Sequence, residues 1–214
     1  MGNGIVSPRG ITITPNQTAA NATIIAAAQT LGGAGNLTLA GTAATFGPDG
    51  VAFLVTLTGT GGTDMSGVNF TISGTDANGG EITAEILAGP NGVGPVTSTQ
   101  YFNTVTQIAV SAATGANVSA GHAGGAGGES RVVFAGRTRV RGIFGTTAAT
   151  ANSITSISDG NQTDGTEIFA IRNPLAAQTL INPADAPGGL LVKDNLQVIL
   201  TANSFLSLTL YYDG

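Results

Sequence analysis

The chain has 214 residues, of which 9% are charged and 33 are glycine, with one histidine, no cysteine and a formal net charge of −5. The acidic balance repels polyanions and argues against general nucleic-acid binding, and the absence of cysteine excludes a disulfide framework and a thiol nucleophile. Threonine, valine and isoleucine between glycine and asparagine, with few helix-forming residues, predict an all-β chain of short strands joined by turns.

The N-terminal stretch has no basic region followed by an apolar core, so it does not resemble a secretory leader. We expect residues 1–20 to form an extended arm that pairs with the edge of a neighbouring subunit's sheet. The following segment, "NQTAANATIIAAAQTL", has enough alanine for a short helix, but its threonine and asparagine content argues against one. No run of apolar residues is long enough to cross a membrane.

The first half of the chain alternates apolar and polar residues in several short runs. Strands are predicted at "GNLTLAG", "VAFLVTLTG", "VNFTISG", "EITAEILAG" and, as two strands, within "PVTSTQYFNTVTQIAVSA". The turn "TDANGG" separates the third and fourth runs, which predicts a β-hairpin with one buried face. On that face we expect apolar side chains at alternate positions, namely Val68, Phe70, Ile72, Ile82, Ala84 and Ile86.

The clearest interruption is the glycine-rich stretch "GHAGGAGGES", residues 121–130. Such stretches act as connectors, and we place a domain boundary within it. We expect a β-sandwich domain at residues 21–124, a linker at residues 125–130 and a second β-sandwich domain at residues 131–214, each immunoglobulin-like or jelly-roll-like. His122 has no catalytic or metal-binding pattern around it, and we expect it to be an ordinary exposed residue.

The second half carries further runs with strand character. They are predicted at Arg131–Phe134, Thr138–Thr146, Ser153–Ser158, Thr166–Ile171, Leu190–Val192, Leu196–Ala202 and Leu206–Tyr212. In the last run, Leu206, Leu208, Leu210 and Tyr212 share one face, so the C-terminal segment is expected to belong to a sheet.

Four of the seven basic residues lie in "RVVFAGRTRVRG", residues 131–142. In an extended chain, Arg137, Arg139 and Arg141 lie on one face together with Arg131, Val133 and Ile143, opposite a core face formed by Val132, Phe134, Val140 and Phe144. Like charges about 7 Å apart along a strand repel each other unless an anion lies opposite. The anion is a nucleic acid or phosphate in one interpretation. In the other, which we favour, it is Asp159, Asp164, Glu167 or a carboxylate of a neighbouring subunit.

The remaining polar clusters have a simpler explanation than catalysis. "SDGNQTDGTE" and "GTDANGGE" place acidic and amide side chains in loops, but neither spacing matches a calcium-binding loop, and Asn and Asp stabilise turns through their own backbone. Glu81 and Glu85 are the carboxylates that a hydrolase would need, and nothing in the sequence determines their separation. We predict no catalytic residues, no metal ligands and no cofactor.

The block Val68–Gly121 resembles a module of virion proteins of tailed bacteriophages. The resemblance lies in the hairpin "FTISGTDANGG", the strand end "EILAGP", the strand "TSTQYFNTVT" and the closing segment "VSAATGANVSAG". The following segment, from "RVVFAGRTRVRG" to "LYYDG", looks like the β domain found beside such modules.

This resemblance implies a non-enzymatic capsid decoration, or cement, protein on the virion surface. Such a protein would assemble as a homotrimer and bind the major capsid protein, without contacting nucleic acid or membrane. The alternative is a tail or fibre component that binds a host receptor or glycan. A hydrolase is the third hypothesis, supported only by scattered carboxylates.

Overall fold

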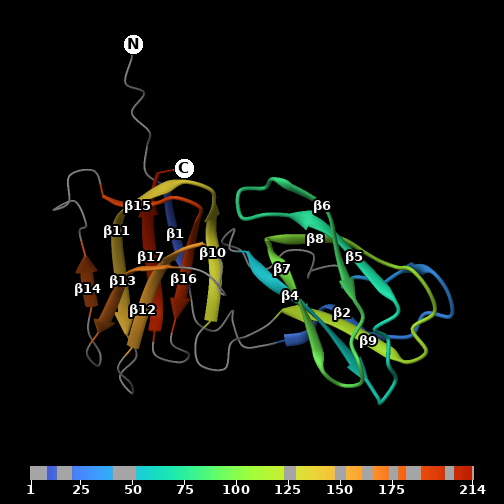
Figure 1. Cartoon of the computed structure of the whole chain (residues 1–214). Coiled ribbons are helices and arrows are strands. Elements are labelled where there is room, and N and C mark those ends of the chain that lie inside the picture. The colour runs from blue at the N-terminus through green and yellow to red at the C-terminus, as the bar shows by residue number, and fades with distance from the viewer. Residues whose placement is uncertain are drawn as a thin grey trace, which may run out of the picture. The chain divides into compact units, whose positions relative to one another are not determined.

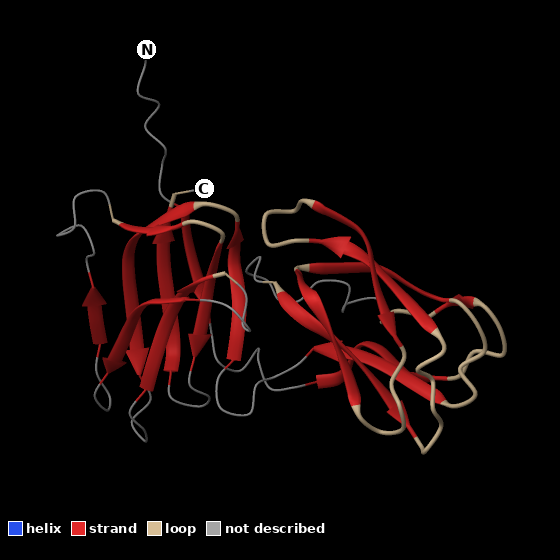
Figure 2. Ribbon diagram, viewed as in Figure 1, coloured by secondary structure: helices blue, strands red, loops and turns tan. Residues whose placement is uncertain are grey.

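The computed structural model describes residues 9–13, 21–40, 52–122, 129–147, 153–160, 166–173, 178–181, 189–200 and 205–213. Within these ranges every regular element is a β-strand, and every pairing of strands is antiparallel (Figure 2). The predicted all-β fold is therefore confirmed. The same ranges contain no helix of the length and hydrophobicity that crossing a bilayer would require.

The chain divides into two compact units, shown in Figure 1. One, here called the inserted unit, comprises Ala20–Gly124. The other, here called the discontinuous unit, combines Met1–Ala19 with Gly125–Gly214. The second junction falls at the start of the connector predicted at residues 125–130, but Glu129 and Ser130 belong to a strand rather than to a linker, and residues 123–128 lie outside the described ranges.

The discontinuous unit is built from two antiparallel sheets. The first has the order β1-β17-β11-β14, with β15 also paired to β11, and its strands are β1 (Arg9–Ile13), β11 (Thr138–Thr147), β14 (Gln178–Ile181), β15 (Leu190–Val192) and β17 (Phe205–Tyr212). The second has the order β10-β16-β12-β13, with β10 (Glu129–Ala135), β12 (Ser153–Asp159), β13 (Thr166–Asn173) and β16 (Asn195–Leu200). All seven strands predicted in this half are present, and β14 is an additional one.

Alternation along β17 determines which face of the first sheet is buried. Leu208, Leu210 and Tyr212 are buried, as predicted, while Tyr211 is exposed. The ring of Tyr212 lies 5.6 Å from that of Phe134 in the second sheet. The core of this unit therefore lies between the two sheets, in a β-sandwich-like arrangement.

The N-terminal strand corrects the expectation of a separate arm. β1 pairs with β17 of its own chain, from Arg9 opposite Tyr212 to Ile13 opposite Leu208. Ile11 and Ile13 alternate inward and are buried, Ile13 to 1% exposure. Burial of two branched apolar side chains stabilises this pairing by roughly 3–6 kcal/mol before the cost of ordering the chain. The N-terminal strand is thus part of the C-terminal sheet.

The inserted unit also contains two sheets of four strands. One has the order β2-β9-β4-β7, with β2 (Asn21–Gln29), β4 (Phe53–Thr60), β7 (Pro95–Phe102) and β9 (Asn117–His122). The other has the order β3-β8-β5-β6, with β3 (Gly35–Asn36), β5 (Asn69–Thr75), β6 (Glu81–Ala88) and β8 (Thr104–Val110). Strand β2 occupies the alanine-rich segment, in agreement with the argument against a helix.

The predicted hairpin forms between β5 and β6, but its buried face differs from the prediction after a β-bulge. Ile72 pairs with Glu85 and Gly74 pairs with Ile82, so β6 carries one extra residue between these pairs. Beyond the bulge the alternation reverses, which buries Glu85 and leaves Ile86 64% exposed. The expected inward orientation of Ala84 and Ile86 is therefore wrong, whereas that of Phe70, Ile72 and Ile82 is right.

Candidate functional site: the charged end of the discontinuous unit

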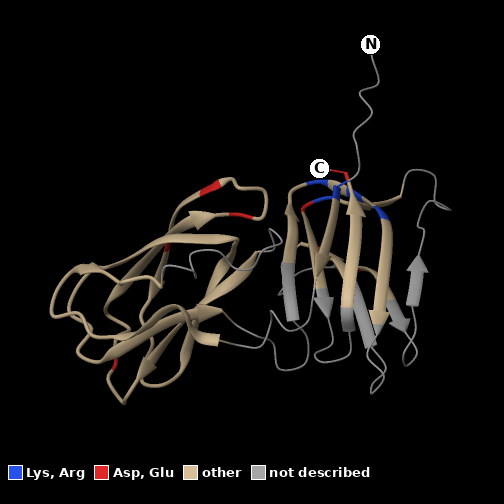
Figure 3. Ribbon diagram, turned by 180° about the vertical axis from the view of Figure 1, so that it is seen from behind, with Lys and Arg blue, Asp and Glu red and all other residues tan. Residues whose placement is uncertain are grey.

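The basic stretch and its predicted partners lie at one end of the discontinuous unit. Arg9 opposes Tyr212, Val140 opposes the same tyrosine, and Arg139 opposes Leu191 two residues before Lys193. In the second sheet Asp159 opposes Leu196, next to the turn at Lys193 and Asp194. These registers bring the N-terminal strand, the β10–β11 turn, the β15–β16 turn and the C-terminal segment together. Figure 3 shows the resulting concentration of charged residues.

This charged end is polarised between the two sheets. Among the described residues, the first sheet and the turn that enters it carry four guanidinium groups and one carboxylate, from Arg9, Arg137, Arg139, Arg141 and Asp213. At this end, the second sheet and the β15–β16 turn carry one ammonium group and three carboxylates, from Lys193, Asp159, Glu167 and Asp194, while Glu129, Arg131 and Arg172 lie farther along β10 and β13. We call these the basic half and the acidic half.

A β-bulge orients Arg141. Val140 pairs with Tyr212 and Gly142 with Tyr211, so Arg141 is the extra residue on β11. The alternation shifts by one beyond it, so that Ile143 is buried and Phe144 is only half-buried. The prediction that Phe144 belongs to the core face and Ile143 to the charged face is wrong for this reason.

A similar shift occurs in β10, where Val132 pairs with Gln197 and Phe134 with Leu196. Val133 is the additional residue, and it is buried together with Val132. Strict alternation through the whole stretch therefore fails at two bulges. Arg137, at the turn, remains exposed, and Arg139 is half-buried.

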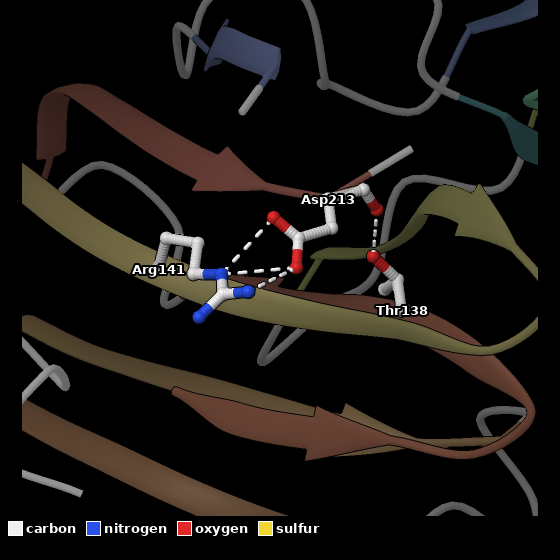
Figure 4. A network of polar contacts seen from close by, with 3 residues as sticks. All are labelled: Thr138, Arg141 and Asp213. Carbon is white, nitrogen blue, oxygen red and sulfur yellow. Dashed lines mark hydrogen bonds and ion pairs between the residues drawn. The ribbon is translucent and has the colours of Figure 1, made fainter. Parts of the chain in front are cut away.

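Arg141 forms a bidentate ion pair with Asp213, the residue that follows β17 (Figure 4). Its Nη2 lies 2.6 Å from Oδ2, and its Nε lies 2.9 Å from Oδ2 and 3.0 Å from Oδ1. The hydrogen bonds to Asp213, together with its negative charge, raise the pKa of Arg141 against the opposing effect of lost hydration. Two nitrogens of the guanidinium thus bind both carboxylate oxygens, which gives the pair directional specificity.

Backbone groups hold Asp213 in the same place. Its N–H donates to the carbonyl oxygen of Arg139 over 3.0 Å, and its own carbonyl oxygen accepts a hydrogen bond from the Thr138 hydroxyl. Three successive contacts therefore attach the C-terminal segment to the start of β11. Sequence reasoning did not identify Asp213, because its contact with Arg141 depends on the register between β11 and β17.

The predicted carboxylates have other positions. Asp159 accepts backbone hydrogen bonds from Lys193 and Asp194, at 3.0 Å and 2.8 Å, and so stabilises the β15–β16 turn. Glu167 is exposed on β13. Asp164 lies outside the described residues. The structure brings Asp159 and Glu167 to the same end as the arginines, but the carboxylate bound to Arg141 is Asp213.

An exposed tyrosine lies next to this ion pair in sequence and register. Tyr211 is 44% exposed, and its neighbours on both adjacent strands are glycines, Gly10 on β1 and Gly142 on β11. A Cβ atom at either glycine would lie 3.3 Å from the tyrosine ring. The ring therefore lies over backbone that has no side chains, on the outer face of the first sheet.

The carboxylates of the inserted unit serve its own backbone. Glu85, buried in β6, accepts hydrogen bonds from the Thr99 N–H at 2.5 Å, the Thr99 hydroxyl at 2.9 Å and the Gln100 N–H at 3.1 Å. Thr99 and Gln100 belong to a bulge of β7, in the opposite sheet, where Tyr101 pairs with Leu54 and Thr97 with Thr56. Glu85 thus links the two sheets of the unit at their edge strands.

Of the two loops considered for cation binding, residues 74–81 contain an Asp-stabilised turn, and residues 161–165 of the other lie outside the described ranges. Asp76 accepts backbone hydrogen bonds from Asn78 and Gly80, each over 2.8 Å, in the β5–β6 turn. In a separate loop, Asp64 accepts a backbone hydrogen bond from Ser66, which lowers the pKa of Asp64. Within the described ranges, no group of three or more histidine or acidic side chains is placed to hold a metal ion.

His122 is buried, contrary to the expectation of an exposed residue. Strand β9 extends to it, and it is paired there with Val55 of β4 and Asn21 of β2. Its ring centroid lies 5.0 Å from that of Phe53, and only 3% of the residue is accessible. The glycine-rich stretch begins at Gly121 in the sequence, but both Gly121 and His122 belong to β9.

Comparisons with known proteins find no match: no family model, no curated protein and no solved structure is similar to this chain. The site is therefore interpreted from its own geometry.

Proposed function

We propose that the chain is a non-enzymatic structural protein of a tailed-bacteriophage virion, which decorates and stabilises the capsid. It binds the major capsid protein and assembles as a homotrimer on the capsid surface. Support comes from the resemblance of Val68–Gly121 to a phage virion module. The observation that carries the proposal is the concentration of charge at one end of the discontinuous unit, whose described strands carry only Glu129, Arg131 and Arg172 as further charged residues.

A surface of this composition suits a binding role rather than a catalytic one. The described carboxylates with the most hydrogen bonds, Glu85 and Asp213, bind backbone groups and an arginine of their own unit. A surface that carries both positive and negative charges favours one orientation of a bound partner, because other orientations bring like charges together. Loss of substrate turnover in a Glu81→Gln or Glu85→Gln variant would contradict the non-enzymatic assignment.

Co-sedimentation of the purified chain with undecorated phage heads tests the proposal. We expect saturable binding with a fixed number of copies per head, weakened by the double reversal Lys193→Glu with Asp194→Lys, and unaffected by Ala88→Lys in the inserted unit. Purified tails that contain the protein while heads lack it would overturn the capsid assignment.

A second candidate, a tail or fibre component that binds a host glycan, is favoured by Tyr211. An exposed aromatic ring without flanking side chains offers one face to the apolar face of a sugar, and the Arg141–Asp213 pair lies beside it in register. A glycan array would decide this. Hits that disappear in Tyr211→Ala and persist in Tyr211→Phe would favour the tail function over decoration.

A further inference from the structure

The two units differ completely in their cations. The inserted unit, Ala20–Gly124, contains no lysine or arginine but five acidic residues, whereas all seven basic residues of the chain belong to the discontinuous unit. Carboxylates of the inserted unit therefore have no cationic side chain within their own unit except the single histidine. Any ion pair that they form with a lysine or an arginine must involve a discontinuous unit or another molecule.

The exposed carboxylates of the inserted unit include one at an accessible hairpin end. Glu81 begins β6 directly after the turn that Asp76 stabilises, and it is exposed. Asp76 lies across the same turn and is half-buried, with one oxygen used by the backbone. Because Asp76 and its hydrogen bonds make the turn well defined, Glu81 is presented at a defined position on the hairpin.

The discontinuous unit offers the complementary surface. Its basic half contains four guanidinium groups and one carboxylate, and the carboxylate is already bound to Arg141. Arg137, at the β10–β11 turn, is exposed and has no ion pair among the described residues. Arg137, close in sequence to two further arginines, attracts an acidic hairpin. Opposite charges on two surfaces increase the rate at which the surfaces meet, and orientations that bring like charges together are disfavoured.

We propose that the acidic β5–β6 hairpin of one copy binds the basic half of a second copy, with Glu81 facing Arg137. This inference rests on the proposed homo-oligomeric function and names its contact. The contact is head-to-tail, because different surfaces of the two copies meet, and such a contact closes into a ring when its rotation allows it. A closed ring of three copies uses every hairpin and every basic half once.

Charge reversal tests this contact in the full-length chain. Sedimentation equilibrium and light scattering are measured for wild type, Glu81→Lys, Arg137→Glu and the double variant. We expect each single reversal to weaken self-association on the order of tenfold or more, and the double variant to recover it, because the two charges exchange places. The control Ala88→Lys with Thr97→Lys makes the same change in net charge as Glu81→Lys, at exposed positions away from the hairpin turn, and should assemble normally.

Mixing the two single variants distinguishes a contact between copies from one within a chain. Copies of the same variant repel each other, because the two contact positions then carry charges of the same sign. In the mixture, the hairpin of Glu81→Lys attracts the basic half of Arg137→Glu, and the hairpin of Arg137→Glu attracts the basic half of Glu81→Lys. The mixture should therefore associate in alternating species with even numbers of copies. Wild-type association should also weaken as the salt concentration rises.

Three results would overturn the inference. One is normal assembly of both single variants. Another is a loss of thermal stability that is independent of protein concentration, with no change in assembly, which would indicate a contact within one chain. If wild type binds heads in either case, the decoration function stands and only the contact is wrong. The third result is a wild-type chain that stays monomeric and does not bind heads, which would contradict both this inference and the proposed decoration function.

Discussion

Arg141 and Asp213 join the start of β11 to the end of the chain through a bidentate ion pair, with Nη2 2.6 Å from Oδ2. Arg141 is in position because it is the extra residue of a β-bulge, and Asp213 because its N–H and carbonyl oxygen bind Arg139 and Thr138. The pair thus depends on two separate backbone features.

A double-mutant cycle should show that these two side chains act as one unit. Arg141→Ala and Asp213→Ala should each lower the melting temperature, and the double variant should lower it no further than the larger single effect. Arg141→Lys should recover only part of the loss, because an ammonium group cannot bind both carboxylate oxygens in the same plane. Differential scanning calorimetry at low and high salt measures this, and strictly additive losses would contradict the coupling.

Ile13→Ala should destabilise the discontinuous unit by about 2–5 kcal/mol, because it leaves a cavity where a 1%-exposed side chain packs. Hydrogen exchange followed by mass spectrometry should show faster exchange in β17 and unchanged exchange in β4. The matched variant Thr12→Ala removes an outward hydroxyl that bonds to Thr209, and should cost about 1 kcal/mol or less. Faster exchange throughout the chain would contradict the assignment of β1 to this unit alone.

Glu85→Gln should destabilise the inserted unit by about 1.5–3 kcal/mol, since the amide cannot accept hydrogen bonds from Thr99 and Gln100 with both of its terminal atoms. Urea denaturation measures the change in free energy of unfolding. The exposed Glu81→Gln should remain within about 0.5 kcal/mol of wild type. Equal losses in the two variants would show that Glu85 has no special role at the β7 bulge.

Tyr212 should ionise above the ordinary pH range of a tyrosine. Burial raises the pKa of Tyr212 above the ordinary value of 10.0, because the phenolate would lose its hydration, and the smaller effect of Arg9 opposes this. The folded state therefore favours the neutral phenol. The stability from this group is fully present below pH 10 and is lost as the pH rises through the folded pKa. A spectrophotometric phenolate titration of wild type and Tyr212→Phe checks this, since the difference between the two curves isolates Tyr212; a difference centred at pH 10 or below would contradict the prediction.

Much of the strand content could be predicted because alternation is a local property. Leu208, Leu210 and Tyr212 are buried as their spacing indicates, and β11 begins at Thr138 as predicted. The predicted orientation of side chains was wrong where a β-bulge adds one residue to a strand. At Glu85 and at Arg141 a bulge reverses the alternation, and the residues that follow change faces. A bulge depends on the partner strand, so local spacing does not reveal it.

The charged site was predictable in part for the same reason. The row of arginines and the nearby Asp159 and Glu167 are visible in the sequence, and the structure brings them to one end. Asp213 as the partner of Arg141 was not visible, because it depends on the register between β11 and β17, which lie far apart in the chain.

The amino-acid sequence by itself determined that this protein is all-β and that a glycine-rich stretch lies near a junction between two units. These properties follow from composition and from the alternation of neighbouring residues, so they can be predicted without knowing which strands pair. Only the tertiary structure decided that β1 completes the C-terminal sheet, which faces follow each bulge and which carboxylate binds Arg141. Those properties depend on pairing between strands that are distant in the chain. For β1 and β17, burial of Ile11 and Ile13 outweighs the entropic cost of closing the long loop between the two strands.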